Sequence, residues 1–255
     1  MPIDLTEYER GDPFDGDYAE ALGAMQSRLE RLQQMQAAHR KRMIVVIEGW
    51  MGSGKRDALK RLVASWDPCQ TLVRCGATDP AREERHWLAP YWEALPTPSS
   101  TTVYFRSWYR RAIDERIAGT TGEKEWIRAL DEINEFESQQ RDHGTLIVKL
   151  FFHVTAAFQS ARLHERQSDP WLRHLLTEAD LKAPEQRRSA LPLIEEMFAQ
   201  TDTRWAPWRV IDANNRQSAH LAAMEAVATA MEKALPKEPP VDQANILNFP
   251  LQNRG

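Results

Sequence analysis

The sequence predicts an α/β fold in which a parallel β-sheet is covered by helices on both faces. Short apolar, β-branched runs such as 43–48 and 146–154 alternate along the chain with stretches of helical periodicity. Such runs are typical of strands buried on both sides, and their alternation with helices favours parallel pairing. A glycine-rich turn between the first run and the next helix is the third observation, and it also indicates chemistry.

Helices are predicted where apolar residues recur at spacings of three and four. The first begins near Asp17, a suitable N-cap, and ends in the cationic residues 39–42, which suit the negative end of a helix dipole. Further helices are expected at 56–66, 81–95, 110–119, 123–141, 156–167, 185–200 and 218–235.

Strands are expected at 43–48, 71–75, 101–105, 146–154 and 208–211. These elements fit one domain over residues 17–235, because a chain of 255 residues can bury a substantial core. Residues 1–16, rich in Asp, Gly and Pro, are expected to form a flexible arm. Residues 236–255 have little pattern and are expected to form a flexible tail.

Composition excludes several classes of function. The net charge of −4 gives no overall positive field, so we expect no nucleic-acid partner. No apolar run approaches the ~20 residues that span a bilayer, and the acidic N-terminus does not look like a secretory signal. Cys69 and Cys75 fit neither a metal-ligand pair nor a disulfide framework. The sequence therefore predicts a cytoplasmic protein without a membrane partner.

The turn Gly49–Lys55 fits the pattern G-x-x-x-x-G-K of a phosphate-binding loop. Its glycines let backbone N–H groups converge on a phosphate at a helix N-terminus, and Lys55 adds a point charge. The residue after the lysine is usually a Ser or Thr that holds Mg²⁺, but here it is Arg56. A turn without a ligand is the alternative, which the flanking strand and helix disfavour. Phosphate or nucleotide contacts are expected at Gly49, Gly52, Ser53, Gly54, Lys55 and Arg56.

Several further segments, in order, accompany this loop. They are Glu48–Lys55, 106–116 with Arg-Ser-Trp-Tyr at its start, 132–149, Asp169-Pro170 and 201–208. Together they resemble the polyphosphate kinase 2 family, over about residues 17–233. Members move phosphate between inorganic polyphosphate and nucleoside mono- or diphosphates, on a thymidylate kinase-like P-loop fold with a helical lid. The resemblance implies a lid at about 156–190, polyphosphate and nucleotide as substrates, Mg²⁺ in active members, and a homo-oligomer.

The sequence departs from this family pattern at its metal-binding carboxylates. Where the family usually has Asp in the loop this chain has Met51, and where the second signature usually opens with Asp it has Phe105. Neither side chain offers Mg²⁺ an oxygen, so we predict no protein metal ligand at these two positions. The lid positions that usually carry lysines and a tryptophan are Leu172, His174 and Leu175.

Removing one well-placed electrostatic group commonly costs about 10²–10³ in rate, so several losses together predict weak or lost activity. The pattern resembles the non-catalytic half of double-domain family members. Glu48, Asp114 and Glu115 are substitute carboxylates that the sequence leaves open; the latter two also fit a solvated helix face.

The resemblance implies catalytic roles for Lys55, Arg106 and Arg111. Arg110 lies beside them without that support, and a salt-bridged helix start is the alternative interpretation of the cluster. Arg162 and Arg166 lie four residues apart on the expected lid helix, where family arginines attract polyphosphate. A solvated helix face with ion pairs explains these two arginines equally well.

Three functional hypotheses follow. The first is a polyphosphate-dependent nucleotide phosphotransferase of reduced activity. The second is an inactive subunit that binds polyphosphate or nucleotide and pairs with an active paralogue. The third, an unrelated P-loop kinase for a small metabolite, is disfavoured by the second signature and by Ala206-Pro207-Trp208.

Overall fold

The predicted parallel sheet is confirmed in a computed structural model, which describes residues 2–76 and 85–240. Five strands pair in parallel in the order β2-β3-β1-β4-β5. The central strand β1 aligns its Val45 with Val103 on one side and Val148 on the other. The strands are β1 (Arg42–Gly49), β2 (Thr71–Cys75), β3 (Thr101–Phe105), β4 (Thr145–His153) and β5 (Trp208–Asp212).

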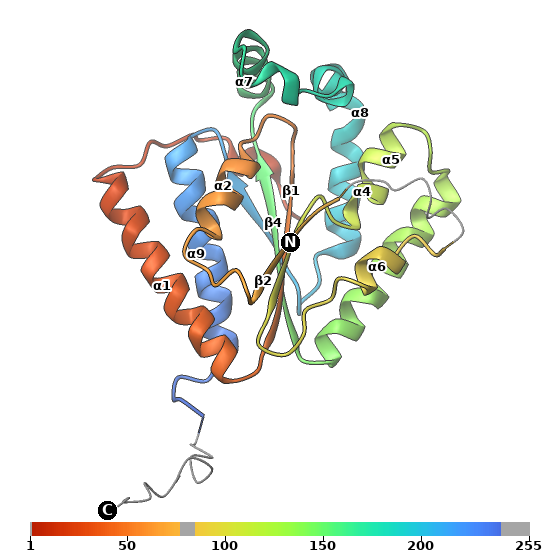
Figure 1. Ribbon diagram of the computed structural model, residues 1–255. Coiled ribbons are helices and arrows are strands. Elements are labelled where there is room, and N and C mark those ends of the chain that lie inside the picture. The colour runs from red at the N-terminus through yellow and green to blue at the C-terminus, as the bar shows by residue number, and fades with distance from the viewer. Residues whose placement is uncertain (1, 77–84, 241–255) are drawn as a thin grey trace, which may run out of the picture.

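Helices cover both faces of this sheet (Figure 1). One side carries α1 (Tyr18–Ala38), α2 (Lys55–Leu62) and α9 (Arg216–Ala234), and α1 packs against α9. The other side carries α4 (Tyr109–Ala112), α5 (Asp114–Ile117), α6 (Glu123–Asp142) and most of α8 (Glu178–Thr201). The helix α7 (Ala156–Ser168) and the start of α8 form an upper lobe beyond the sheet.

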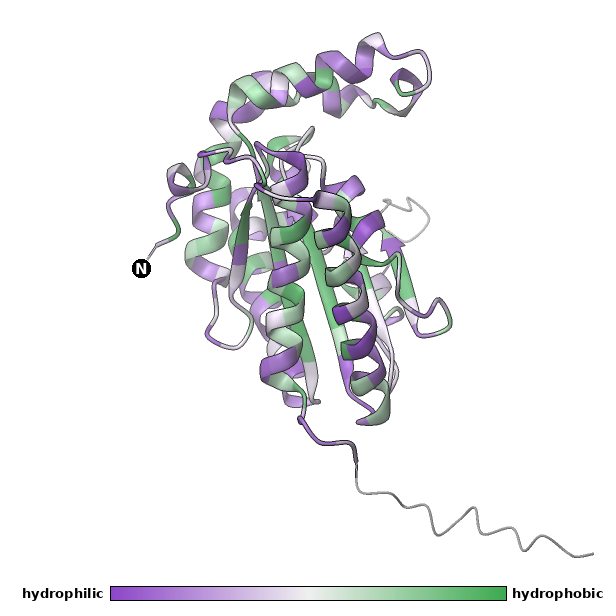
Figure 2. Ribbon diagram, turned by 90° about the vertical axis from the view of Figure 1, so that its left-hand side faces the viewer, coloured by the Kyte–Doolittle hydropathy of each residue, from purple (hydrophilic) through white to green (hydrophobic). Residues whose placement is uncertain are grey.

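The core lies between the sheet and these two helix layers. Residues 43–47 of β1 are almost completely buried, and burial of each such side chain contributes about 1.5–3 kcal/mol. Beyond the sheet the upper lobe alternates polar and apolar residues along its length (Figure 2). Among residues 2–76 and 85–240, no helix is long and apolar enough to cross a membrane.

Charged side chains also enter the core. Lys149 of β4 and Glu137 of α6 are fully buried, with Nζ 2.8 Å from Oε2. The lysine also donates to the hydroxyl of Tyr109 and the carbonyl of Thr201, at 3.0 and 2.7 Å. Glu137 accepts further hydrogen bonds from Trp108 Nε1 and the Tyr109 hydroxyl. This network, hereafter the Lys149–Glu137 network, joins α4, α6, β4 and α8.

Several element boundaries differ from those predicted. Residues 81–84 of the helix expected at 81–95 lie outside the described residues, and the described remainder contains only the short helix α3 (Ala89–Trp92). The helix expected at 110–119 is divided into α4 and α5 at Ile113. The long helix α8 starts earlier than expected, at Glu178, because the Thr177–Asp180 capping box satisfies its first N–H groups.

The N-terminal segment, expected to form a flexible arm, makes specific contacts with the rest of the protein between residues 5 and 11. It contains the 3₁₀ helix η1 (Leu5–Tyr8), whose Leu5 is buried, and η1 packs against β5. The Gly11 N–H donates to Asp212 at 2.7 Å, and Glu9 lies 3.0 Å from His153. One buried leucine in a polar segment has no periodicity, so the sequence pattern did not reveal this packing. Residues 241–255 of the expected tail lie outside the described residues.

Candidate phosphate-binding cleft

The loop Gly49–Lys55 lies at the carboxyl edge of the sheet, between the end of β1 and the start of α2. Its first residue must be glycine, because φ is +133° at Gly49 and a Cβ there would overlap the backbone of Phe152. Gly54, the N-cap of α2, is also left-handed, with φ +80°. The loop leads directly into the N-terminus of α2, and within it the N–H groups of Trp50 and Ser53 donate to the carbonyls of Phe152 and Trp50, at 3.1 and 3.2 Å.

Lys55 is buried beside this loop. Its Nζ donates to the carbonyls of Gly49 and Trp50, at 2.6 and 3.0 Å. Burial, together with the positive charge of Arg106, lowers the pKa of Lys55 to about 8. The buried hydroxyl of Ser53 has no hydrogen-bond partner among the described residues. Arg56 is exposed, with its guanidinium carbon 5.8 Å from the ring centre of Phe105.

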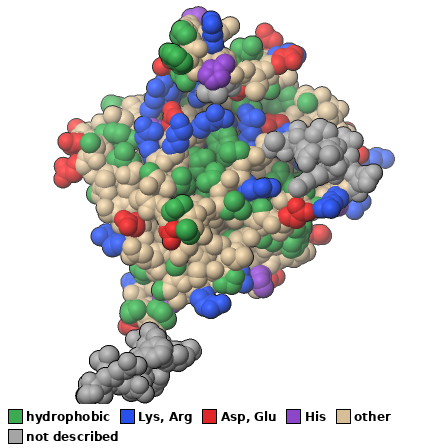
Figure 3. Space-filling view, viewed as in Figure 1, with side chains coloured by type: hydrophobic (Ala, Val, Ile, Leu, Met, Phe, Trp, Pro, Cys, Tyr) green, Lys and Arg blue, Asp and Glu red, His purple; other side chains and the backbone are tan. Residues whose placement is uncertain are grey.

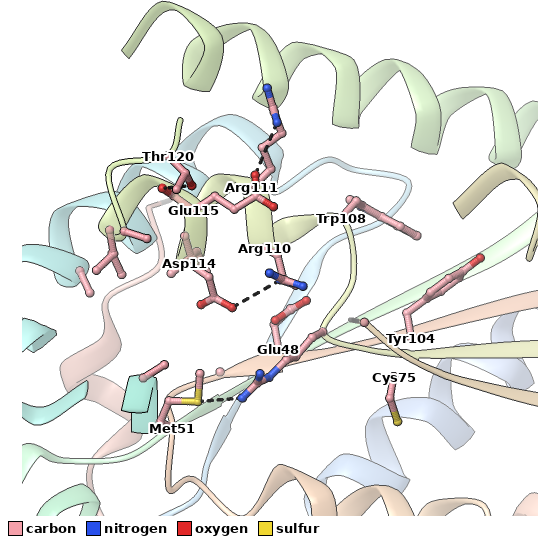
Figure 4. Close-up of a pocket in the computed structure, with 18 of the residues that line it drawn as sticks. Glu48, Met51, Cys75, Tyr104, Trp108, Arg110, Arg111, Asp114, Glu115 and Thr120 are labelled. Atoms are coloured by element: carbon pink, nitrogen blue, oxygen red, sulfur yellow. Dashed lines mark hydrogen bonds and ion pairs between the residues drawn. The ribbon is translucent and has the colours of Figure 1, made fainter. Parts of the chain in front are cut away.

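A second group of cations faces the loop from the end of β3 and from α4. Arg106 has a left-handed backbone, φ +62°, and its Nη2 lies 3.2 Å from Met51 Sδ (Figure 4). Arg110 is 3.9 Å from Asp114, and Arg111 is 3.5 Å from Glu115. The Nε atoms of all three arginines are buried and have no hydrogen-bond partner among the described residues.

Arg106, Arg110 and Arg111 line a cleft of about 1580 Å³ between the sheet edge and α8. Lysine and arginine side chains gather in a band between the upper lobe and the body (Figure 3). The cleft is large enough for an extended ligand, and its cations suit an anionic one. Asp114 and Glu115 line it as well, paired with Arg110 and Arg111.

Glu48 is buried at the end of β1, directly before the loop. Its Oε1 accepts hydrogen bonds from the N–H and the hydroxyl of Ser107, at 2.6 and 2.8 Å. Burial raises the pKa of Glu48 to about 7, and the nearby negative charge of Asp114 adds to the shift. The carboxyl group therefore fastens the start of the Arg-Ser-Trp-Tyr turn to the phosphate loop.

The two arginines expected on the lid helix have different positions. Arg162 of α7 is buried, and its Nη2 lies 3.2 Å from the place a Cβ would occupy on Gly54. Its guanidinium also lies over the ring of Phe158, at 4.9 Å. Arg166, one turn further on, is half-buried, and neither arginine lines the main cleft.

Sequence reasoning missed the residues that attach α7 and α8 to the loop. Gln159 donates to the Met51 carbonyl at 3.0 Å and accepts from Arg187 Nη1 at 3.1 Å. Arg187 also lies over the ring of Trp50, at 4.1 Å, and Trp50 Nε1 donates to His153. Nothing in the local pattern marks these residues, because Gln159 lies 108 positions from Met51 and 28 positions from Arg187 in the sequence.

The two positions where the family usually has carboxylates offer Mg²⁺ no oxygen here, while Glu48 and Asp114 are the carboxyl groups that act on each other beside the loop. Among residues 2–76 and 85–240, no three carboxylate, histidine or cysteine side chains converge. Met51 offers a thioether and Phe105 a ring, whereas Mg²⁺ takes oxygen ligands. Glu48, directly before the loop, already accepts two hydrogen bonds from Ser107 through Oε1.

A parallel sheet, a glycine-rich loop that leads into a helix, and a cationic cleft at the carboxyl edge define a P-loop kinase-like protein. The profile of the polyphosphate kinase 2 family matches residues 14–239. The chain therefore belongs to the polyphosphate kinase 2 family.

Individual relatives agree with this assignment. The polyphosphate:AMP phosphotransferase of Pseudomonas aeruginosa is 31% identical over 92% of this chain and 48% of its own length. The GDP-polyphosphate phosphotransferase of Mycolicibacterium smegmatis is 32% identical over 88% of this chain and 81% of its own length. The chain thus spans about half the length of the Pseudomonas relative.

Solved structures share the fold. A structure from Pseudomonas aeruginosa described as a polyphosphate kinase 2 superposes with a TM-score of 0.84 at 30% identity, over 91% of this chain and 49% of that one. The polyphosphate kinase 2 of Arthrobacter aurescens superposes with a TM-score of 0.83 at 24% identity, over 96% and 89%. The parallel P-loop fold expected from the sequence is confirmed.

Proposed function

We propose that this chain binds inorganic polyphosphate and a nucleoside mono- or diphosphate in the cleft and transfers phosphate between them only weakly. The observation that carries the proposal is that Lys55 and Arg106 lie together beside the phosphate loop. The part of the loop that these two side chains border is hereafter called the mouth of the loop. The positive charge of Arg106 lowers the pKa of Lys55, and an anionic phosphate between the two side chains relieves that repulsion. Curated relatives are named for transfer between polyphosphate and AMP or GDP.

In this proposal Lys55, Arg106 and Arg111 neutralise the transferring phosphate, and the loop N–H groups hold its oxygens. Arg162 adds positive charge from the upper lobe beside Gly54. Mg²⁺, when bound with substrate in an active enzyme, would neutralise charge on the phosphates. We attribute the weak transfer to the lack of carboxylate oxygens at Met51 and Phe105.

A second candidate is an inactive subunit that binds polyphosphate or nucleotide and assembles with an active paralogue or with a second copy. The observation that favours it is length, because the chain spans 48% of the Pseudomonas phosphotransferase. A double-length relative has room for two such domains, and one of them would need no chemistry of its own. Size-exclusion chromatography with light scattering would give the oligomeric state.

The test is an assay of nucleotide phosphorylation with polyphosphate, Mg²⁺ and AMP, ADP or GDP. We expect little product from the unaltered chain and more from Met51→Asp/Phe105→Asp, which restores two carboxylates. The matched control is Met51→Asn/Phe105→Asn, which has nearly the same shape without the negative charges. A robust rate in the unaltered chain would contradict the weak transfer. Silence in every variant would favour the inactive subunit.

A further inference from the structure

The charges at the mouth of the loop are unevenly paired. Each of three cleft cations has a carboxylate within 4 Å: Arg110 has Asp114, Arg111 has Glu115, and Lys182 has Glu178. Lys55 and Arg106 have no such carboxylate among the described residues. Lys55 donates to two backbone carbonyls, and Arg106 contacts a thioether.

The position of Arg106 is imposed by the fold. A left-handed backbone is uncommon for a residue with a side chain, and such conformations persist only where surrounding contacts enforce them. Here the Arg106 N–H donates to Ile47 at 3.3 Å, and Gly76 packs so closely on the Arg106 carbonyl that a Cβ would overlap it. The guanidinium is therefore held next to the loop before any ligand arrives.

Met51 leaves that guanidinium available. Its sulfur lies 3.2 Å from Nη2, and a thioether is only a weak hydrogen-bond acceptor without charge. An aspartate at this position would form an ion pair with Arg106 and neutralise it. With methionine, the donors of Arg106 retain their full charge for the planar, bidentate recognition of a phosphate.

Glu48 does not offset these cations fully. Its pKa of about 7 means that a substantial share of the carboxyl group is protonated at neutral pH. Its Oε1 is also committed to Ser107. Asp114 and Asp180 also act on Lys55, but neither forms an ion pair with Lys55 or Arg106 among the described residues, so the two cations can still pair with a polyanion.

From this arrangement we propose that the cleft binds the phosphate chain of polyphosphate directly through Arg106 and Lys55, without a divalent cation. The inference rests on the proposed function. It adds that Met51 does not neutralise Arg106, so the Arg106 guanidinium takes the charge-neutralising role that a metal ion would otherwise have. It follows that Mg²⁺ competes with the protein, because a phosphate chain that is already neutralised is attracted less strongly to the two cations.

The first experiment measures binding of sodium tripolyphosphate and of long-chain polyphosphate to the full chain by isothermal titration calorimetry. One series contains EDTA and the other contains excess Mg²⁺, at equal ionic strength because exposed charges are screened by salt. We expect binding in EDTA that is at least as tight as binding in Mg²⁺. Binding only in Mg²⁺ would overturn this inference and leave the proposed function standing, whereas no binding in either series would contradict both.

The second experiment tests the assignment to Arg106. We expect Met51→Asp to weaken binding in EDTA about tenfold or more, as loss of a charge-assisted hydrogen bond does, and to make Mg²⁺ favourable. Met51→Leu is the matched apolar control and should retain binding in EDTA. Arg106→Gln should weaken binding by a similar factor, whereas Arg141→Ala, at the opposite end of the sheet beside Trp205, should not.

Thermal unfolding of each variant, followed by circular dichroism, separates lost binding from a lost fold. Should Met51→Asp not fold, Arg106→Gln carries the test by itself. Unchanged binding in EDTA by a folded Arg106→Gln would overturn the assignment.

Discussion

The Lys149–Glu137 network and the mouth of the phosphate loop both bury charged side chains, but they treat them in opposite ways. In the network each charge has an opposite partner and further hydrogen bonds. At the loop, Lys55 and Arg106 share a sign and lie close enough for Arg106 to lower the pKa of Lys55. The difference teaches that charge paired within the fold stabilises the native packing, whereas charge left unpaired is available to a ligand.

The largest effect is expected in the network. Lys149→Met leaves Glu137 buried without its partner, and breaking one side of such a pair costs about 3–5 kcal/mol of unfolding free energy. Urea denaturation of the two proteins measures this loss of unfolding free energy. Lys149→Met/Glu137→Gln should recover part of the loss, because the neutral amide oxygen still accepts from Trp108 and Tyr109. A single variant as stable as the unaltered chain would show that the pair contributes nothing to the fold.

The next effect is a pH dependence from Glu48. Its folded pKa, about 7, lies above the ordinary 4.5, so its contribution to stability is present below pH 4.5 and is lost as pH rises through 7. The shift corresponds to a free energy on the order of 3 kcal/mol. Glu48→Gln keeps an acceptor for Ser107 and should remove this dependence of the unfolding free energy on pH. Urea midpoints at pH 5 and 8 test this, and equal slopes in both proteins would contradict it.

A smaller effect is expected on anion binding through Lys55. Its folded pKa, about 8, lies below the ordinary 10.5. Burial of the charged ammonium group therefore lowers the free energy of unfolding below pH 8, and this loss is recovered as pH rises from 8 toward 10.5. Whereas stability rises with pH, binding of tripolyphosphate should weaken about tenfold between pH 7 and 9.5, because Lys55 loses its charge. Lys55→Arg stays charged throughout this range and should bind tripolyphosphate with little pH dependence. A calorimetric titration at both pH values measures the difference.

The smallest effect separates the two arginines of α7. Arg162→Ala should weaken polyphosphate binding a few-fold, because its guanidinium lies beside Gly54. Arg166→Ala should change it by less, since the half-buried Arg166 does not lie beside Gly54 and a partly exposed charge is screened by salt. Fluorescence titration of the two variants in parallel gives the comparison. Equal losses would indicate that general positive charge on α7, rather than position, attracts the polyanion.

The sequence predicted the elements whose information is local. The buried run of β1, the glycines of the loop and the N-cap Asp17 each depend on neighbours within a few positions. The resemblance named Lys55, Arg106 and Arg111; the structure places Arg106 and Arg111 in the cleft and buries Lys55 beside it, against the Gly49 carbonyl. Their chemical roles stay predictions, which the phosphorylation and binding experiments address.

Residues 2–16 and the start of α8 have contacts that the local sequence pattern did not predict. Leu5 and Glu9 follow no helical or strand period, yet they pack against β5 and His153 more than a hundred residues away. The early start of α8 depends on a reciprocal cap between Thr177 and Asp180 in a segment interpreted as lid. In both cases a few specific contacts, rather than a repeated pattern, fix the conformation.

By itself the sequence determined a parallel α/β sheet, a phosphate loop and the absence of carboxylates at positions 51 and 105. Strand periodicity, glycine geometry and residue identity are written in the order of the chain. Only the tertiary structure decided that Arg106 contacts Met51, that Glu48 is buried on Ser107, and that Arg162 reaches the loop. These contacts join residues from different strands and helices, so the distances that set their charges and pKa values exist only once the sheet has folded.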